Sequence, residues 1–170
     1  MAQAPSHSAT PEDLLALRPF QSILVVEDER IVALDITARL KRLGYVVAGV
    51  AASGEAALEA CRDNPPSLVL MDIFLDGGMD GIEATQRIRE FFDIPVVYIT
   101  SHDDQMTLRR AAKTAPYGYV IKPVDERWLQ SAIEVALVKH ATEIDLRRSE
   151  ERFRRRSEER RVGKECRSRG

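Results

Sequence analysis

The sequence predicts an α/β fold in which helices cover both faces of a five-stranded, doubly wound parallel sheet. Two observations predict it. Between residues 22 and 140, five short apolar runs alternate with five segments of helical character, and none of the runs has a polar residue at every second position. Strand–helix alternation is typical of parallel sheets, and strands covered on both faces are continuously apolar. Right-handed crossovers then divide the helices between the two faces.

The first strand–helix unit begins at residue 22. The run 22–26 (SILVV) is apolar, rich in β-branched residues and too short for a helix. The segment 29–44 is predicted to be a helix, and Gly44 is a typical stop signal. Its apolar residues near helical spacing are Ile31, Leu34, Ala38 and Leu43.

The second unit pairs a strand at 45–51 with a helix at 54–64. Ser53 is the predicted N-cap, because its hydroxyl can accept a hydrogen bond from a free backbone N–H of the first turn. Pro65 and Pro66 end the helix, since proline has no N–H to continue the hydrogen-bonding pattern.

The last three units repeat the pattern. Their predicted strands are 67–71, 95–100 and 117–121, and their predicted helices are 81–92, 103–113 and 126–140. Asp80 and Asp125 precede two of these helices as N-caps. The fifth helix has seven apolar residues between Trp128 and Leu137, whereas a surface helix usually has about three or four in two turns.

The segments outside this body differ from it in composition. Residues 1–20 are rich in Ala, Ser and Pro and predict a flexible leader. Residues 141–170 predict a charged helical extension of the 21–140 body, with a truncated or read-through end. The extension holds 11 Lys/Arg and 7 Asp/Glu, a net charge of +4, against −6 for the rest of the chain.

This basic extension is a weak indication of nucleic-acid binding, because runs of charge are usually solvated helix faces. Since 48 residues follow Lys122, we expect no DNA-binding module and no direct DNA binding. The hexapeptide RRSEER occurs at 147–152 and at 155–160. That step of eight residues does not match the coiled-coil period, and we expect no regular apolar seam there.

Composition also limits where the protein acts. No apolar run is long enough to span a membrane, and the first residues lack the pattern of a signal peptide. Cys61 and Cys166 lie far apart without metal-ligand spacing. A cytoplasmic protein is therefore expected.

Polar side chains follow four of the five predicted strands. They are Glu27 and Asp28 after the first, Asp72 after the third, Thr100 at the end of the fourth and Lys122 after the fifth. Each alone has a structural explanation, such as a helix cap or a solvated strand end. Together they are expected to lie at one edge of the sheet, because the carboxyl ends of parallel strands meet there. Ligands of open α/β sheets bind outside these ends.

The chemistry of such a cluster is phosphoryl transfer. Three carboxylates that repel one another need a cation, and oxygen ligands with room for water suit Mg²⁺. One carboxylate can attack phosphorus and form an aspartyl phosphate. A metal, an ammonium and a hydroxyl would stabilise the phosphoryl oxygens.

The motifs ILVVEDE, LVLMDI, PVVYITS and GYVIKP resemble, in order and spacing, the receiver domain of two-component response regulators. The resemblance covers residues 21–140 and implies a flavodoxin-like strand order, 2-1-3-4-5. It implies that Asp72 is the phosphoacceptor. The implied Mg²⁺ ligands are Glu27, Asp28, Asp72 and the backbone carbonyl of Phe74.

The resemblance also implies the remaining roles. Thr100 would be the switch hydroxyl, Lys122 would pair with the phosphoryl group, and Tyr119 would be the aromatic switch. The Lys122–Pro123 peptide would be cis. Phe74 and His102 would flank the attacking water, and because Phe74 cannot orient a water, we expect slow autodephosphorylation.

A signalling switch that accepts phosphate from a histidine kinase or phosphotransfer protein is therefore expected, with only self-phosphorylation and self-dephosphorylation activity. An aspartyl-nucleophile phosphatase is a poor alternative, because Phe74 stands where its acid is needed. A nucleotide-binding fold lacks its glycine motif. The glycines at 77, 78 and 81 are interpreted as backbone flexibility beside the metal.

Two further expectations concern the carboxyl-terminal part of the chain. The stretch LRRSEERFR resembles the lead-in to a PAS domain, so the chain could be the receiver fragment of a larger PAS/histidine-kinase chain. The apolar excess of the fifth helix, beside Tyr119, resembles the face of the fourth helix, fifth strand and fifth helix through which receivers pair. We expect a homodimer through this face, strengthened by phosphorylation and propagated along 138–150.

Overall fold

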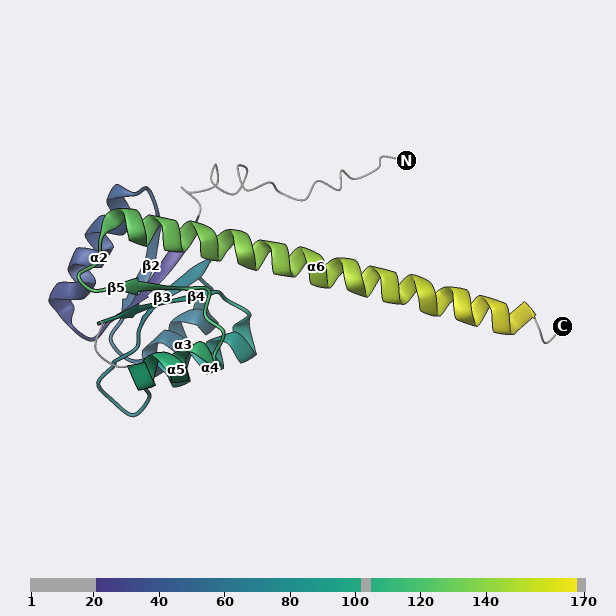
Figure 1. Cartoon of the computed structure of the whole chain (residues 1–170), viewed down its shortest axis with the longest axis horizontal. Coiled ribbons are helices and arrows are strands. Elements are labelled where there is room, and N and C mark those ends of the chain that lie inside the picture. The colour runs from purple at the N-terminus through teal and green to yellow at the C-terminus, as the bar shows by residue number, and fades with distance from the viewer. Residues whose placement is uncertain (1–20, 102–104, 168–170) are drawn as a thin grey trace.

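The computed structural model describes residues 21–101 and 105–167. The strands are β1 (Ser22–Val26), β2 (Val46–Ala51), β3 (Leu68–Asp72), β4 (Val96–Thr100) and β5 (Gly118–Ile121). The helices are α2 (Arg30–Arg42), α3 (Gly54–Asp63), α4 (Gly81–Phe92), α5 (Gln105–Ala112) and α6 (Glu126–Arg167). All neighbouring strands pair in parallel, in the order β2-β1-β3-β4-β5 (Figure 1). The predicted fold class and strand order are confirmed.

Two apolar clusters separate the helices into two layers. One cluster packs α3, α4 and α5 on one face of the sheet, through residues such as Ala57, Ile88 and Ala111. The other packs α2 and α6 on the opposite face, through residues such as Ile36 on α2 and Ile133 on α6. This division is the doubly wound arrangement that right-handed crossovers produce.

The sheet is fully covered only at its centre. All residues of β3 and β4 are buried, but Val46 and Val50 on β2, and Tyr119 and Ile121 on β5, are exposed. The prediction that all five strands are covered on both faces is therefore wrong at the two edges. The helices cover the centre of the sheet and leave some side chains of its two outer strands exposed. Apolar composition does not reveal which strands are the outer ones.

The face of α2 that packs on the sheet differs from the prediction. Ala33, Ile36 and Leu40 are buried, whereas Ile31 and Leu34 are largely exposed. Residues three and four apart lie on the same face of a helix, so the buried set is a regular stripe. The helix is confirmed, but its predicted apolar set mixed the two faces.

Three predicted N-caps are confirmed by their hydrogen bonds. The Ser53 hydroxyl accepts from the Ala56 N–H at 3.2 Å, and Asp80 Oδ1 accepts from the Glu83 N–H at 2.8 Å. Asp125 Oδ1 accepts from two N–H groups at the start of α6. Each bond satisfies a donor that the helix itself leaves free.

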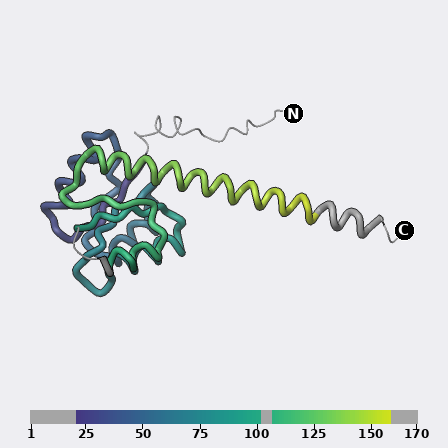
Figure 2. The backbone as a smooth tube through the Cα atoms, in the orientation of Figure 1, coloured from purple at the N-terminus to yellow at the C-terminus, as the bar shows by residue number. Residues whose placement is uncertain are grey.

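Helix α6 has 42 residues and extends far beyond the sheet (Figure 2). At about 1.5 Å per residue it is about 63 Å long. Its first half supplies Leu129, Ile133 and Ala136 to the core, and Trp128 and Val135 are exposed. The apolar excess predicted for this helix is thus confirmed. In the part of the chain that the structure describes, no helix is long and apolar enough to cross a membrane.

Candidate functional site

The carboxyl ends of β1 and β3 bring three carboxylates together. Glu27 and Asp28 follow β1, and Asp72 is the last residue of β3. One carboxylate oxygen of each lies within 4.8 Å of the other two. Glu27 and Asp72 are buried, so their charges are poorly solvated, and their mutual repulsion requires a cation nearby.

Lys122, which follows β5, supplies one positive charge. Its Nζ lies 2.7 Å from Asp72 Oδ2 and 2.9 Å from Glu27 Oε2. The side chain of Lys122 is 25% exposed, against 1% for Glu27 and 5% for Asp72. Burial lowers the pKa of the Lys122 ammonium, but the hydrogen bonds and charges of the two carboxylates outweigh it and raise the pKa above its ordinary value.

Glu27 experiences the opposite balance. Burial raises the pKa of its carboxyl group above the ordinary value, and the charge of Asp72 adds to this effect. Lys122 and the Glu29 N–H, which donates to Glu27 Oε1 at 3.1 Å, oppose the rise without cancelling it. One ammonium therefore does not neutralise the cluster, and a further cation would be stabilised there.

Backbone N–H groups orient the other carboxylates. The Phe74 N–H donates to Asp72 Oδ1 at 3.0 Å, so both oxygens of Asp72 have a partner. The Asp76 N–H donates to Asp28 Oδ2 at 3.0 Å, which joins the turn after β1 to the loop after β3. Asp28 is not the cap of α2, because Glu29 occupies that position and no side chain caps the helix.

Gly81 lets the first turn of α4 approach Asp72. A Cβ at Gly81 would lie 1.9 Å from the carbonyl oxygen of Asp72 and 2.9 Å from its carbonyl carbon. The Gly81 N–H donates to the Ile73 carbonyl at 3.1 Å. The interpretation of this glycine as a source of flexibility is therefore corrected: it permits a close approach. No pattern in the sequence indicates this contact, which depends on the path of the loop.

Two other residues singled out in the sequence lie at neighbouring strands. Thr100, at the end of β4, is buried, and its hydroxyl donates to the Ser101 carbonyl at 3.0 Å. The ring of Tyr119 on β5 is partly exposed and packs against Tyr98, with 5.7 Å between ring centroids. The Lys122–Pro123 peptide is cis, as the resemblance implied.

Phe74 and His102 are the remaining residues singled out in the sequence. The Phe74 side chain is exposed at the start of the loop after β3. His102 lies outside the described residues. The structure thus brings Glu27, Asp28, Asp72 and Lys122 into one cluster. A set of carboxylate oxygens beside an ammonium can hold a hard divalent cation and a phosphoryl group.

Comparison with known proteins identifies the family that this chain resembles. The family model described as response regulator receiver domain matches residues 23–134. The transcriptional regulatory protein AfsQ1 of Streptomyces coelicolor is 34% identical over 116 residues, covering 68% of this chain and 51% of that protein. PdtaR of Mycobacterium tuberculosis, also a transcriptional regulatory protein, is 31% identical over 115 residues, covering 68% and 56%. The chain therefore spans about half the length of these relatives.

Solved structures agree with the sequence relatives. The signal receiver domain of a modulated diguanylate cyclase from Desulfovibrio desulfuricans G20 has a TM-score of 0.69 and 38% identity, covering 72% of this chain and 97% of that one. A LuxR-family two-component response regulator from Aurantimonas has a TM-score of 0.64 and 31% identity, covering 78% and 97%.

Proposed function

This chain belongs to the response regulator receiver domain family, and we propose that it is a cytoplasmic phosphorylation switch whose phosphoacceptor is Asp72. The observation that carries the proposal is the position of Asp72. It ends a fully buried strand, lies beside Glu27 and Asp28, and accepts a hydrogen bond from Lys122. A purely structural carboxylate would not need two further carboxylates beside it.

The residues of the cluster fit a bound Mg²⁺. Glu27, Asp28 and Asp72 would hold it through carboxylate oxygens, and the carbonyl of Phe74 is the fourth proposed ligand. The fit rests on the donor set, since hard oxygen ligands are those that Mg²⁺ prefers. When bound, the ion would neutralise charge on the phosphoryl oxygens.

The proposed reaction is a transfer of the phosphoryl group from a phosphohistidine to Asp72. A carboxylate oxygen of Asp72 attacks phosphorus, an O–P bond forms, and the P–N bond to the histidine breaks. The released imidazole keeps the electron pair of that bond and takes up a proton. Lys122 and the Thr100 hydroxyl then bind phosphoryl oxygens, so Lys122 exchanges a carboxylate partner for a phosphoryl one.

The donor would be a histidine kinase or a phosphotransfer protein. Ile31 and Leu34 are largely exposed in the first turns of α2, directly after the acidic pair. Exposed apolar side chains beside a reactive group are typical of a surface that a protein partner covers. They support a protein donor, because a small phosphodonor would not cover these exposed apolar side chains.

Intact mass spectrometry after incubation with acetyl phosphate and Mg²⁺ tests the proposed function. We expect the mass of one phosphoryl group to be added to the wild-type protein. The increase should be absent from Asp72→Asn, which keeps the size of the side chain and loses the nucleophile, and absent after chelation of the metal. Labelling that persists in Asp72→Asn would rule out Asp72 as the acceptor.

Phe74→Asn is expected to shorten the lifetime of the phosphorylated protein. An amide two positions beyond Asp72 can orient a water that the phenyl ring of Phe74 cannot. A gain of about 1.4 kcal/mol in the transition state gives about tenfold faster hydrolysis. The decay of the phosphorylated mass measures the rate, and Phe91→Asn, at another exposed phenylalanine, is the control. An unchanged rate would show that this position does not control the water.

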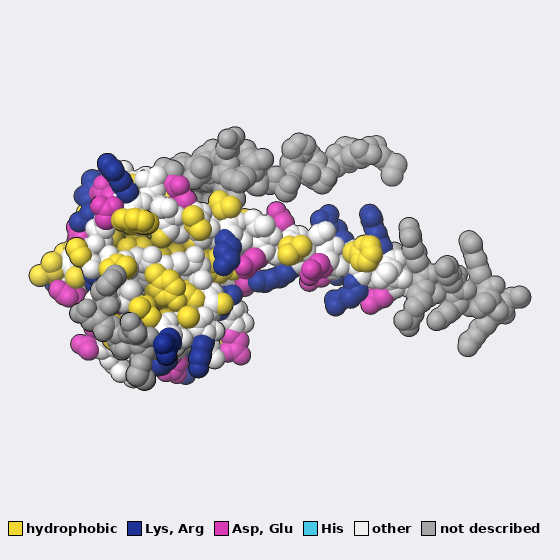
Figure 3. All heavy atoms as spheres, viewed as in Figure 1, with side chains coloured by type: hydrophobic (Ala, Val, Ile, Leu, Met, Phe, Trp, Pro, Cys, Tyr) yellow, Lys and Arg dark blue, Asp and Glu magenta, His cyan; other side chains and the backbone are white. Residues whose placement is uncertain are grey.

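We also propose that the phosphorylated protein self-associates. The surface involved consists of α5, β5 and α6, where Tyr119, Ile121, Trp128 and Val135 are exposed. Figure 3 shows hydrophobic side chains gathered over β5 and the first half of α6. An exposed apolar patch of this kind is typical of a protein interface.

A further inference from the structure

The second half of α6 has little contact with the body of the protein. All described side chains from Asp145 to Glu158 are exposed. From Arg148 to Arg167 the helix extends about 30 Å at 1.5 Å per residue. In proteins most of the stability of a helix comes from tertiary packing of one of its faces, and the exposed side chains of this segment receive no such packing from the body. A partner along this segment would supply that packing.

Polar contacts fix the helix where it leaves the body. The Tyr117 hydroxyl donates to Glu143 Oε2 at 2.6 Å, and Arg147 Nη1 lies 2.8 Å from Asp93 Oδ2. The Lys139 ammonium lies 5.4 Å from the centre of the Tyr117 ring. These contacts join α6 to the start of β5 and the end of α4. They hold the rotation of the helix about its axis, so the same side of α6 remains outward.

One side of α6 carries four large exposed apolar side chains between residues 128 and 153. Trp128 is 74% exposed, Val135 57%, Leu146 59% and Phe153 77%. Successive members are 7, 11 and 7 residues apart. At 3.6 residues per turn, all four fall within about 20° of one another around the helix axis. Figure 3 shows hydrophobic side chains continuing from the body along the projecting helix.

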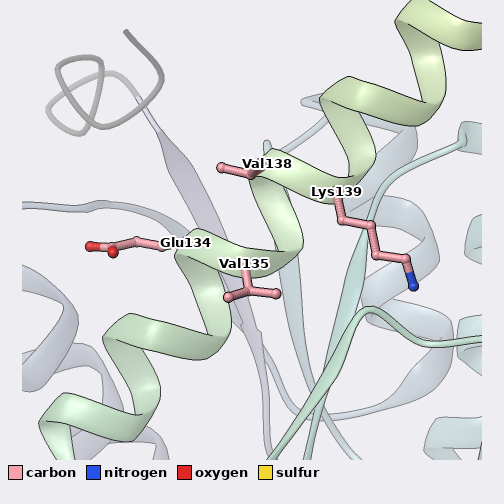
Figure 4. Close-up of a pocket in the computed structure, with 4 residues that line it drawn as sticks. All are labelled: Glu134, Val135, Val138 and Lys139. Atoms are coloured by element: carbon pink, nitrogen blue, oxygen red, sulfur yellow. The ribbon is translucent and has the colours of Figure 1, made fainter. Parts of the chain in front are cut away.

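The same side follows heptad spacing, with apolar residues at five of its eight positions. Steps of four and three residues lead along the seam through Trp128, Ala132, Val135, Lys139, Thr142, Leu146, Ser149 and Phe153. Within residues 146–161, where no regular apolar seam was predicted, Leu146 and Phe153 are the apolar seam residues, one heptad apart with Ser149 between them. An open hollow of about 320 Å³ on this helix is lined by Glu134, Val135, Val138 and Lys139. Figure 4 shows Glu134 and Val138 on one side of the helix and Lys139 on the other.

We propose that residues 128–153 of α6 form a parallel, two-stranded coiled coil with the same residues of a second copy of this chain. The proposal rests on the proposed self-association and specifies its geometry. A two-fold dimer uses the same surface of both copies. The seam continues the exposed face of β5 and α6, and the proposal places the two-fold axis along α6, so that both helices run in the same direction.

Pairing of two α6 helices along the seam is expected to be weak, which allows phosphorylation to control it. Lys139, Thr142 and Ser149 interrupt the apolar positions. A parallel pair also places Asp145 opposite Glu150 of the second copy, across positions where opposite charges favour pairing. The helices alone therefore pair poorly. Contact between the two bodies raises the local concentration of the helices and allows the seam to close.

Cysteine cross-linking tests the geometry, in a Cys166→Ser background treated with acetyl phosphate and Mg²⁺. Phe153→Cys lies on the seam, and its matched control Arg155→Cys lies at nearly the same height on the opposite side of the helix. We expect mild oxidation to give a covalent dimer with Phe153→Cys, at least tenfold more than with Arg155→Cys. Equal cross-linking of both variants would overturn the coiled coil.

Light scattering separates this inference from the self-association on which it rests. A phosphorylated dimer without selective cross-linking leaves self-association standing and removes the coiled coil. A monomer under phosphorylating conditions removes both.

The variant Asp145→Lys tests the direction of the two helices. A parallel pair places the new ammonium opposite Glu150 of the second copy, so an attraction replaces a repulsion and the phosphorylated protein should dimerise more tightly. In an antiparallel pair of residues 128–153 the two positions lie far apart. Dimerisation that does not tighten would therefore overturn the parallel arrangement.

Discussion

Gly81→Ala is expected to destabilise the protein more than any other single methyl group added at a described glycine. The new Cβ would lie 1.9 Å from the Asp72 carbonyl oxygen and 3.1 Å from the Ile73 Cα. Both are backbone atoms of the central sheet and its exit, so neither can move without displacing β3. Overpacking typically costs about 1–3 kcal/mol, and contacts with backbone atoms place this substitution at the upper end of that range. Urea unfolding followed by circular dichroism measures the loss.

Gly78→Ala is the matched control for this substitution. A Cβ at Gly78 would meet only Glu55 Oε1, at 3.3 Å, the end of a side chain that can turn away. Its unfolding free energy should stay within about 0.5 kcal/mol of the wild type. Because Gly81 adjoins Asp72, Gly81→Ala should also slow phosphorylation in whatever fraction remains folded. Equal stability of the two variants would contradict the close approach.

Lys122→Ala is expected to have the second large effect. The substitution leaves Glu27 and Asp72 buried without their cation. Removing one member of a buried ion pair costs about 3 kcal/mol. Since the pKa of Lys122 is raised, its stabilisation is fully present below the ordinary value of 10.5 and is lost only as pH rises through the raised value. Neutral pH is therefore suitable for the measurement.

The metal dependence of this variant distinguishes the site from an ordinary ion pair. Mg²⁺ should recover part of the lost stability, because binding to the folded state stabilises it by mass action, about 2.7 kcal/mol at a concentration of 100 Kd. Lys113→Ala removes an exposed lysine and should change neither stability nor its response to Mg²⁺. A Lys122→Ala protein as stable as wild type without metal would contradict the electrostatics of the cluster.

The positions of the site residues could be predicted because parallel strands share one direction. Glu27, Asp72 and Lys122 follow strands that are recognisable as apolar runs, and the ends of those strands meet at one edge of the sheet. The order of the strands came from the resemblance to receiver domains. Side-chain pairing within the cluster, such as the shared contact of Lys122, depends on distances that only the fold supplies.

Other features could not be predicted, for physical reasons. On α2, the small Ala33 belongs to the buried stripe, whereas the larger Ile31 and Leu34 are exposed, so size and hydropathy indicated the wrong face. The need for glycine at 81 arises from a contact with the backbone of Asp72, nine residues earlier in the chain. Such contacts depend on the path of a loop, which leaves no periodic signal in the sequence.

The central claim, that the phosphoryl group is carried by Asp72, is tested most directly by locating the modified residue. Borohydride reduces an aspartyl phosphate to homoserine, and peptide mass spectrometry then identifies the position. After treatment with acetyl phosphate and Mg²⁺, we expect homoserine in place of Asp72 and at no other aspartate. Reduction at Asp28 or Asp76 instead, or a phosphoryl group that resists borohydride, would contradict the assignment.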